Sequence, residues 1–432
     1  MNDDTIALRA EGLYKVFGRH ADEAVIALHR GTPRDRLGSG TTAAVIDASF
    51  DVRRGEIFVV MGLSGSGKST LIRMLNGLHN ATAGTVEIGG EHITGIPAKR
   101  LREIRRARIS MVFQHFALLP HRTVLDNVAY GLEIQGVAKA EREAKARKVT
   151  RIVGLAGWEE RLPSQLSGGM QQRVGLARAL AADTDVLLMD EAFSALDPLI
   201  RREMQDQLLE LQAELGKTIV FITHDLNEAM YLGDRIAVMR DGRIVQIGAP
   251  EDILTNPADD YVEQFVQDVD RTKVLTAESV MRKPRAVVHV GAGPRAALTL
   301  MRDEQLAGAY VVTKDRSIVG WVRDRDVFEL VRRGDKDLAS VIRSDHGAVA
   351  TDTALAELFI PSLEAALPLG VLDTRDRLVG VIPRVTLLAA LGGEPEAAVQ
   401  AAPRPDPLPT EVVDRVLEAA VGTGAAGAKE AL

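Results

Sequence analysis

The chain has no cysteine among its 432 residues, and only 4% of the residues are aromatic. Without cysteine, neither a disulfide framework nor a cysteine-based zinc site can form, which agrees with a reducing compartment. Basic residues are not in excess either, because the formal net charge is −7. Domains that bind nucleic acid are usually strongly basic, so the composition argues against a nucleic-acid partner.

Long apolar runs are also missing. A helix that crosses a bilayer needs roughly 20 mostly apolar residues in a row, and the sequence has no such run. The beginning of the chain mixes charged and apolar residues and lacks the basic start and apolar centre of a secretory signal. Any path through a membrane must therefore come from another chain.

What the sequence does contain is a normal share of hydrophobic residues, 46%, and a length typical of two or three domains. Up to about residue 270, short apolar runs alternate with helical patterns. This alternation predicts an α/β domain with a mainly parallel sheet over residues 1–270, interrupted early by an insertion with one helix. The expected strands are 56–61, 110–113, 186–189 and 218–223, and the expected helices are 68–78, 170–182 and 199–215.

The second region, residues 277–390, contains a weak internal repeat. Residues 309–320 resemble residues 369–380, and the closing glycines, Gly320 and Gly380, are 60 residues apart. Each copy has the pattern of a strand, a turn, a second strand and a helix, and two copies that cannot bury a sheet alone are expected to pack together. The Ala-, Pro- and Glu-rich residues 391–432 are predicted to be mostly disordered, with one helix at 410–421.

A phosphate-binding loop is the first chemical signal. The sequence GLSGSGKS, from Gly62 to Ser69, matches G-x-x-x-x-G-K-[ST] between an expected strand and an expected helix. Glycines let backbone N–H groups curl around phosphates, the lysine adds a cation, and the serine hydroxyl suits Mg²⁺. A Gly/Ser turn without function is the alternative. The predicted nucleotide ligands are Gly62, Ser64, Gly65, Ser66, Gly67, Lys68, Ser69 and Thr70.

An acidic pair closes the expected strand at 186–189. Asp190 fits a carboxylate that holds Mg²⁺, and Glu191 fits a residue that activates or orients an attacking water. An ordinary strand end with two loop carboxylates is the alternative. The phosphate loop upstream favours the catalytic interpretation, in which Lys68 also stabilises charge on the phosphates.

The residues LSGGMQQR, from Leu166 to Arg173, resemble the LSGGQ signature of ABC ATPases, 23 residues before Asp190 when counted from Ser167. The resemblance implies ATP and Mg²⁺ as ligands, and it implies further roles by position. Gln114 corresponds to the Q-loop glutamine that contacts Mg²⁺, Asp197 closes the D-loop, and His224 is the switch histidine that contacts the γ-phosphate. Phe17, with Tyr14 as its rival, corresponds to the aromatic that stacks on adenine.

The same resemblance implies a homodimer. In this family, the signature residues of one ATPase domain face the nucleotide on the phosphate loop of the other. Ser167, Gly168 and Gly169 are therefore predicted to contact the partner's nucleotide. Residues 117–127 correspond to the loop that docks the membrane partner, and four apolar residues support this: Phe116, Leu118, Leu119 and Pro120.

A closer resemblance is to the ATPase subunits of glycine betaine/proline importers. It rests on residues 115–127, residues 189–201, the insertion at 19–44 and the C-terminal repeats, which resemble tandem CBS modules. It implies a transmembrane permease and a periplasmic or lipid-anchored substrate-binding protein as partners. It also implies a peripheral position on the cytoplasmic face of the inner membrane. Other cargoes such as choline, carnitine or another amino-acid-like solute remain alternatives, as does a soluble ABC ATPase without a transport role.

The CBS resemblance implies regulation by an adenine nucleotide or a cyclic dinucleotide, but both copies depart from the nucleotide-binding pattern. The first keeps Asp326 and has Arg323 in the place of Ser/Thr, and the second has Thr386 in the place of Asp. A regulatory role near an anionic membrane surface is a second interpretation, through Arg323, Arg325, Arg332 and Arg333. The basic run at 99–108 is interpreted as a solvated helix face.

Overall fold

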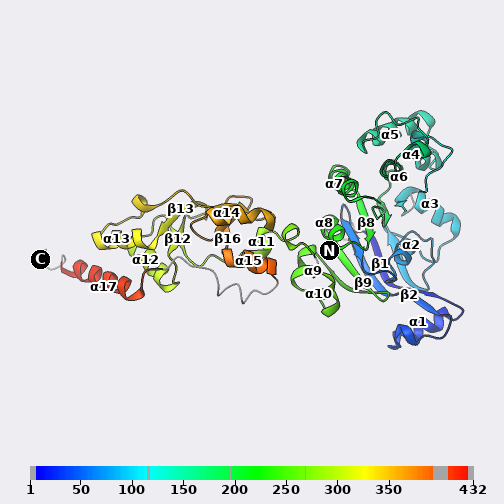
Figure 1. Cartoon of the computed structure of the whole chain (residues 1–432). Helices are drawn as coiled ribbons and strands as arrows, with labels where there is room; N and C mark the ends of the chain where they lie inside the picture. Colours follow the sequence, from blue (N-terminus) through cyan, green and yellow to red (C-terminus); the bar gives the residue numbers. More distant parts are fainter. Residues whose placement is uncertain (1–5, 114–116, 195, 268, 393–406, 427–432) are drawn as a thin grey trace. The chain divides into compact units, whose positions relative to one another are not determined.

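The computed structural model describes residues 6–113, 117–194, 196–267, 269–392 and 407–426. The chain divides into two compact units, Met1–Val269 and Asp270–Leu432 (Figure 1). No helix in these described ranges is long and apolar enough to cross a membrane.

A six-stranded sheet forms the centre of the first unit, with the strand order β10-β9-β3-β8-β7-β6. The pairs β3–β8, β8–β7, β7–β6 and β3–β9 are parallel, and β10 is antiparallel at one edge. The predicted α/β fold with a mainly parallel sheet is therefore confirmed. Its strands are β3 (Ile57–Met61), β6 (Ile109–Val112), β7 (Val186–Asp190), β8 (Thr218–Thr223), β9 (Arg235–Arg240) and β10 (Arg243–Gly248).

A second, antiparallel sheet with the order β2-β1-β4-β5 packs against the first. Its strands are β1 (Ile6–Phe17), β2 (Thr42–Arg53), β4 (Ala83–Ile88) and β5 (Glu91–His92). One hydrophobic core joins both sheets, and Phe50 of β2 stacks on Phe58 of β3 with ring centroids 5.0 Å apart. The insertion between β1 and β2 holds α1 (Ala21–His29) and η2 (Arg34–Arg36), and it buries Val25 and Leu28 beside Tyr14.

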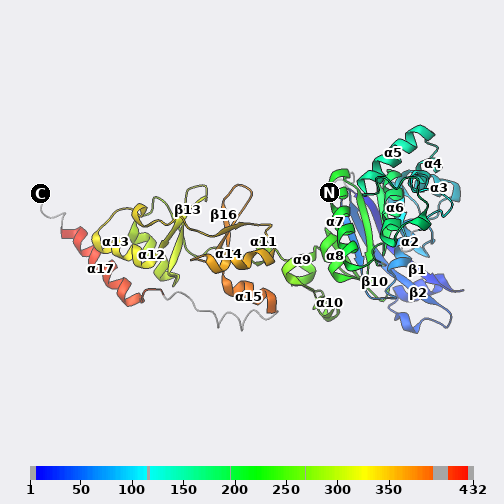
Figure 2. The same cartoon turned by 45° about the horizontal axis from the view of Figure 1, so that its top comes forward.

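The helices of the first unit take up most of the remaining chain. The group α4, α5 and α6 packs together at one end of the unit, and α7 and α8 lie side by side at the sheet (Figures 1 and 2). Helix α3 contains the basic run and buries Ile104, as the solvated-face interpretation requires. The bounds are α2 (Lys68–Leu75), α3 (Ala98–Arg108), α4 (Val124–Ile134), α5 (Lys139–Ile152), η3 (Pro163–Gln165), α6 (Gly168–Ala181), α7 (Pro198–Leu215), α8 (Leu226–Leu232), α9 (Pro250–Thr255) and α10 (Asp260–Phe265).

The second unit contains two three-stranded sheets that share one register. Val311 pairs with Gly320 in the first sheet and Val371 pairs with Gly380 in the second, so the 60-residue offset holds for both hairpins. The first sheet is β11 (Val287–His289), β12 (Gly308–Val312) and β13 (Ile318–Arg323). The second is β14 (Ala348–Ala350), β15 (Leu369–Leu372) and β16 (Leu378–Ile382).

Helices cover the two sheets unequally. Helix α17 (Thr410–Ala426) packs on α12 and α13 of the first copy and buries Val413 in its core, within the stretch predicted to be mostly disordered (Figure 2). In the second copy, Ile360 and Leu363 of α14 are exposed. The remaining bounds are η4 (Arg271–Lys273), α11 (Ala277–Val280), α12 (Pro294–Asp303), α13 (Asp324–Arg333), η5 (Ala339–Val341), η6 (Leu355–Leu358), α14 (Phe359–Glu364) and α15 (Arg384–Gly392).

Candidate functional site

The loop between β3 and α2 has a backbone that glycine alone tolerates at two positions. Gly62 and Gly67 have φ angles of 150° and 104°, and a Cβ atom there would lie 2.2 Å from the Met239 carbonyl and 2.1 Å from the Ala44 carbonyl. Gly65, with φ 81°, faces open space. The glycines therefore let the loop pass close to the neighbouring strands while its tip stays accessible.

Lys68 opens helix α2 and turns its side chain back under the loop. Its Nζ donates to the carbonyl oxygens of Gly62, at 2.8 Å, and Leu63, at 3.2 Å. Burial lowers the pKa of the Lys68 ammonium, and the nearby Glu191 and Asp190 carboxylates oppose that shift. The lysine is thus a buried cation held by backbone dipoles at the centre of the loop.

The Ser69 hydroxyl points at the end of β7. Its Oγ donates to Oδ1 of Asp190 at 3.1 Å, and an Arg73 Nη lies 3.9 Å from the other carboxylate oxygen. Burial raises the pKa of Asp190, although the hydrogen bond from Ser69 and the charge of Arg73 oppose the shift. These two oxygen donors lie together, and the buried carboxylate gains from a cation, so the pair fits the hard-cation chemistry of Mg²⁺.

Glu191 follows β7 in a left-handed backbone conformation with φ 48°. Its N–H donates to the Ile222 carbonyl on β8, and its Oε2 lies 3.3 Å from Nδ1 of His224. The structure therefore brings together residues that are far apart in sequence, because parallel strands end at the same edge of the sheet. The cluster at this edge comprises Lys68, Ser69, Asp190, Glu191 and His224.

The signature residues and Asp197 begin two helices. The side chain of Ser167 accepts from the N–H of Met170 at the start of α6, and Asp197 accepts from Ile200 at the start of α7. Ser167 and Gly168 are exposed. Within the described residues, no side-chain hydrogen bond or ion pair joins Ser167 to the phosphate loop.

The two candidates for adenine stacking differ in exposure. Phe17, at the end of β1, is 42% exposed and contacts His79 edge-on with ring centroids 5.8 Å apart, whereas Tyr14 is 2% exposed in the core. The Lys15 ammonium lies 5.0 Å from the Phe17 ring centre. Only Phe17 of this pair offers a ring face to a ligand.

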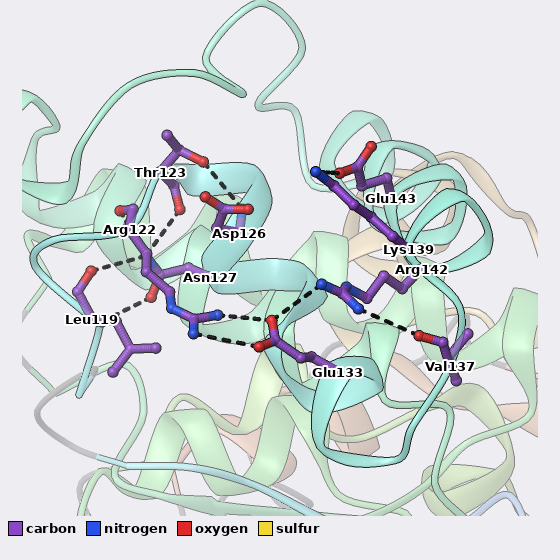
Figure 3. Close-up of polar contacts among 10 residues, drawn as sticks. All are labelled: Leu119, Arg122, Thr123, Asp126, Asn127, Glu133, Val137, Lys139, Arg142 and Glu143. Carbon is purple, nitrogen blue, oxygen red and sulfur yellow. Dashed lines mark hydrogen bonds and ion pairs between the residues drawn. The ribbon is translucent and has the colours of Figure 1, made fainter.

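The loop that follows the Q-loop is fixed by a fully buried amide. The Asn127 Nδ2 donates to the carbonyls of Leu119, Arg122 and Thr123, and its Oδ1 accepts from the Leu119 N–H (Figure 3). The Arg122 guanidinium donates to both carboxylate oxygens of Glu133, at 2.9 and 3.5 Å. A loop of this kind presents a defined surface, because its backbone is held from behind.

The other end of this loop touches the signature helix. Ala117 has a left-handed φ of 46°, and its carbonyl accepts from Arg178 of α6 at 2.8 Å. Gln114 and Phe116 lie outside the described residues, as does Ala195 of the D-loop. Arg73 and Arg178 lie outside the predicted motifs, and the buried amide of Asn127 at the end of the predicted docking loop was not expected, because these contacts depend on packing.

In the second unit, the Asp326 carboxylate of the first copy is engaged by the chain itself. Arg343 donates to its Oδ2 at 2.8 Å, and the same guanidinium lies 5.3 Å from the Trp321 ring centre. In the second copy, the Thr386 hydroxyl is buried without a hydrogen-bond partner among the described residues. The pattern residues therefore do not form two equivalent sites.

Comparison with known proteins gives two matching family models. The ABC transporter model matches residues 45–194, and the CBS domain model matches residues 277–333. The chain is 50% identical over 398 residues to the glycine betaine transport ATP-binding protein of Bacillus subtilis, which covers 92% of this chain and 95% of that protein. It is 50% identical over 388 residues to the glycine betaine/carnitine transport ATP-binding protein of Listeria monocytogenes, covering 89% and 98%.

A third relative has another named cargo. The trimethylamine N-oxide transport ATP-binding protein of Ruegeria pomeroyi is 50% identical over 276 residues, which covers 64% of this chain and 81% of that protein. Among solved structures, a component of an ABC transporter complex from Clostridium perfringens matches with a TM-score of 0.50 and 25% identity, covering 61% and 93%. Four members of the cluster at the sheet edge, Lys68, Ser69, Asp190 and Glu191, lie within the residues that the ABC transporter model matches, and His224 lies beyond them.

Proposed function

The chain belongs to the ATP-binding subunits of ABC transporters, and from that membership we propose that it powers import of glycine betaine or a related osmoprotectant. It is an ABC-type ATPase whose phosphate loop and acidic pair lie at one edge of the sheet. The identity of the cargo is inferred from how much of the chain each relative matches. The glycine betaine relative matches 92% of the chain, including the second unit, whereas the trimethylamine N-oxide relative matches 64% at the same identity.

The side chains divide the reaction among them. Lys68 places a buried positive charge beside the phosphates and stabilises the charge that develops during transfer. Glu191, fixed by its own backbone hydrogen bond and by His224, orients the attacking water and accepts its proton. Phe17 stacks on the adenine.

Mg²⁺ is the metal that these residues fit. Ser69 and Asp190 would hold it, with Gln114 as a third ligand from the family resemblance. The ion, when bound, neutralises charge on the phosphate oxygens. The chain's own contribution is to keep the Asp190 carboxylate buried beside the Ser69 hydroxyl. Because burial disfavours the negative charge of this carboxylate, a bound cation stabilises it.

The assembly we propose is a homodimer on the cytoplasmic face of the membrane, with a permease and a substrate-binding protein. The exposed Ser167 and Gly168 support it, because they contact their own helix and remain available to a nucleotide on a partner. ATP binding closes such a dimer and hydrolysis reopens it. The loop held by Asn127 is the surface that receives the permease.

The second unit is assigned a regulatory role. Its CBS match supports a ligand-responsive domain, and adenine nucleotides or cyclic dinucleotides are the ligand classes that the resemblance implies. The exposed arginines of α13 suit an anionic membrane surface as the other source of a signal. Deleting residues 277–432 should change how transport responds to salt, and an unchanged response would exclude this role.

The test of cargo uses sealed vesicles that contain this chain, its permease and its binding protein. We expect ATP-driven uptake of radiolabelled glycine betaine with the wild-type chain and none with Glu191→Gln. Unlabelled glycine betaine should compete better than unlabelled carnitine, choline or trimethylamine N-oxide. ATP hydrolysis without betaine uptake would retain the ATPase and reject the cargo.

A further inference from the structure

One arginine on helix α7 contacts two loops that border the acidic cluster. The Nη1 of Arg201 donates to Oδ2 of Asp225 at 3.0 Å, and its Nη2 donates to the carbonyl of Leu196 at 3.2 Å. Leu196 belongs to the D-loop, and Asp225 directly follows the switch histidine. A single planar guanidinium therefore joins the D-loop to the switch segment, and the two contacts use different nitrogens of its fork.

Asp225 is itself fixed at three points. Its Oδ1 accepts from the N–H groups of Asn227 and Glu228, at 3.0 and 3.3 Å, and so caps helix α8. Its own N–H donates to the Thr223 hydroxyl at 2.9 Å. The residue between Thr223 and Asp225 is His224, whose side chain is mostly exposed. The backbone on both sides thus determines where the imidazole lies.

The D-loop is tied to the acidic pair at its other end. The Ser194 hydroxyl and N–H both donate to the Glu191 carbonyl, at 2.9 and 3.2 Å. The described part of the D-loop is thus held at Ser194 by Glu191 and at Leu196 by Arg201, and Arg201 also binds Asp225 beside His224. A shift of Asp225 or Leu196 would break a contact with Arg201.

Helix α7, which contains Arg201, and helix α8, which Asp225 caps, are joined by a second contact one turn further on. The buried Gln205 of α7 donates to Oε1 of the buried Glu228 of α8 at 3.1 Å. Because this second contact holds α7 and α8 together, loss of Arg201 is expected to free the loops without separating the helices.

We propose that Arg201 is a positioning residue for ATP hydrolysis, which holds His224 and the D-loop in one geometry relative to Glu191. The proposal rests on the ATPase function above and adds a role that none of the motif residues supplies. Its effect acts through His224 and Glu191, so it should appear in turnover and leave nucleotide binding unchanged.

The test compares Arg201→Gln with Arg202→Gln in the full-length chain. Arg202 is the matched control, because it is the next residue of the same helix and binds Asp206 and the Tyr231 ring in place of the two loops. We expect kcat to fall about tenfold or more in Arg201→Gln, since small misplacements of reacting groups are costly, while KM for ATP stays within about twofold. Arg202→Gln should keep both constants.

Two further variants separate positioning from simple charge. Asp225→Asn keeps the helix cap, because asparagine caps as well as aspartate, and it removes the charged partner of Arg201. The double variant Arg201→Gln/Asp225→Asn should have a kcat no lower than that of the more severe single variant, because both substitutions remove the same contact between Arg201 and Asp225. Arg201→Lys keeps the charge without the fork, and it should restore less than half of the lost turnover.

The outcomes distinguish this proposal from the ATPase assignment. Inactive wild-type protein would reject the ATPase assignment itself. An active wild type with equal kcat for Arg201→Gln and Arg202→Gln would reject the role of Arg201 and leave the ATPase assignment intact. Additive effects of Arg201→Gln and Asp225→Asn, or full turnover in Arg201→Lys, would reject that role as well. Equal melting temperatures for Arg201→Gln and Arg202→Gln show that the change in kcat does not come from unfolding.

Discussion

The two units use the carboxylates that follow their strands in opposite ways. In the first unit, Asp190 is buried against a serine hydroxyl, and burial raises the pKa of its carboxyl group. In the second unit, Asp373 accepts two hydrogen bonds from the Arg377 guanidinium, which lower the pKa of its carboxyl group to about 2. Asp326 is likewise paired with Arg343.

This difference agrees with the proposed position of the ATPase site in the first unit. A buried carboxylate without a full counter-charge gains from a cation, and this supports the Mg²⁺ site that we propose at the end of β7. A carboxylate that an arginine has already neutralised gains little from another cation and instead fixes its own turn. Asp190 is therefore left without a full counter-charge, whereas Asp373 and Asp326 are paired with arginines of their own unit.

The largest predicted effect tests whether turnover depends on the first unit alone. Glu191→Gln keeps the shape of the side chain and removes its ability to accept a proton, so ATP turnover should fall roughly 10²–10⁴-fold. Glu357→Gln, an exposed glutamate of the second unit, is the matched control and should leave turnover of the full chain unchanged. Phosphate release measures both. Equal losses would mean that the acidic pair is not the catalytic centre.

The next effect concerns stability and should be confined to the first unit. Asn127→Ala removes the four hydrogen bonds by which one fully buried amide holds the loop before α4, so we expect a loss of about 3 kcal/mol in the free energy of unfolding. Asn80→Ala removes an exposed amide and should cost far less. Calorimetry can resolve separate transitions of the two units. A shift in the second unit's transition alone would contradict the prediction.

A smaller effect on stability should distinguish the two copies of the repeat within the second unit. Val413 of α17 is 2% exposed in the first copy, whereas Ile360 of α14 is 70% exposed in the second. Val413→Asp places a charge in an apolar core and should destabilise the second unit by about 2 kcal/mol, the cost being limited because a terminal helix can detach.

Ile360→Asp is the matched control and should change the same melting transition by less than about 0.5 kcal/mol. Similar losses in both variants would show that the two copies are covered alike. Hydrogen exchange of the α12 and α13 amides gives a second measurement, since detachment of α17 exposes that face.

The sequence predicted the strands well because a buried parallel strand is a short continuous apolar run, as 186–189 and 218–223 are. It also predicted the hairpins of the second unit, since the 60-residue repeat carries through to the register at Val311 and Val371. The helix predicted at 410–421 is present as α17, within a stretch otherwise predicted to be disordered. Its packing on α12 and α13 was not predictable, because α17 occurs once and follows no repeat that would show where it docks.

The candidate site shows the same limit. The phosphate loop and the acidic pair predicted Lys68 and Asp190, and the family resemblance implied His224. Parallel strands that end at one edge explain why the three lie close together. Arg201 and Asn127 were missed, because their importance comes from contacts with loops up to 24 residues away in the sequence. Such contacts follow from packing, which no local pattern encodes.

The smallest predicted effect concerns the pH dependence of stability. One carboxylate in each unit has a shifted pKa, and the two shifts have opposite signs. Burial raises the pKa of Glu228 in the first unit, although hydrogen bonds from Thr223 and Gln205 oppose the shift, so the folded state holds its proton more tightly than the unfolded state does. Stability is then lost as pH rises from the ordinary carboxyl range upward. Glu228→Gln should raise the melting temperature at pH 8 by about 2 °C, and this gain should vanish near pH 4.

Asp373 should show the reverse, because its folded pKa is lowered to about 2 by Arg377. Its contribution to stability is fully present above the ordinary carboxyl range and is lost as pH falls through the lowered value. Asp373→Asn should therefore lower the melting temperature of the second unit at neutral pH, with the difference disappearing in acid. Melting curves of both variants from about pH 2 to pH 8 test both predictions, because the Asp373 contribution is lost only near its lowered pKa. Shifts of the same sign in the two variants would contradict the contrast between a carboxylate with a raised pKa and one with a lowered pKa.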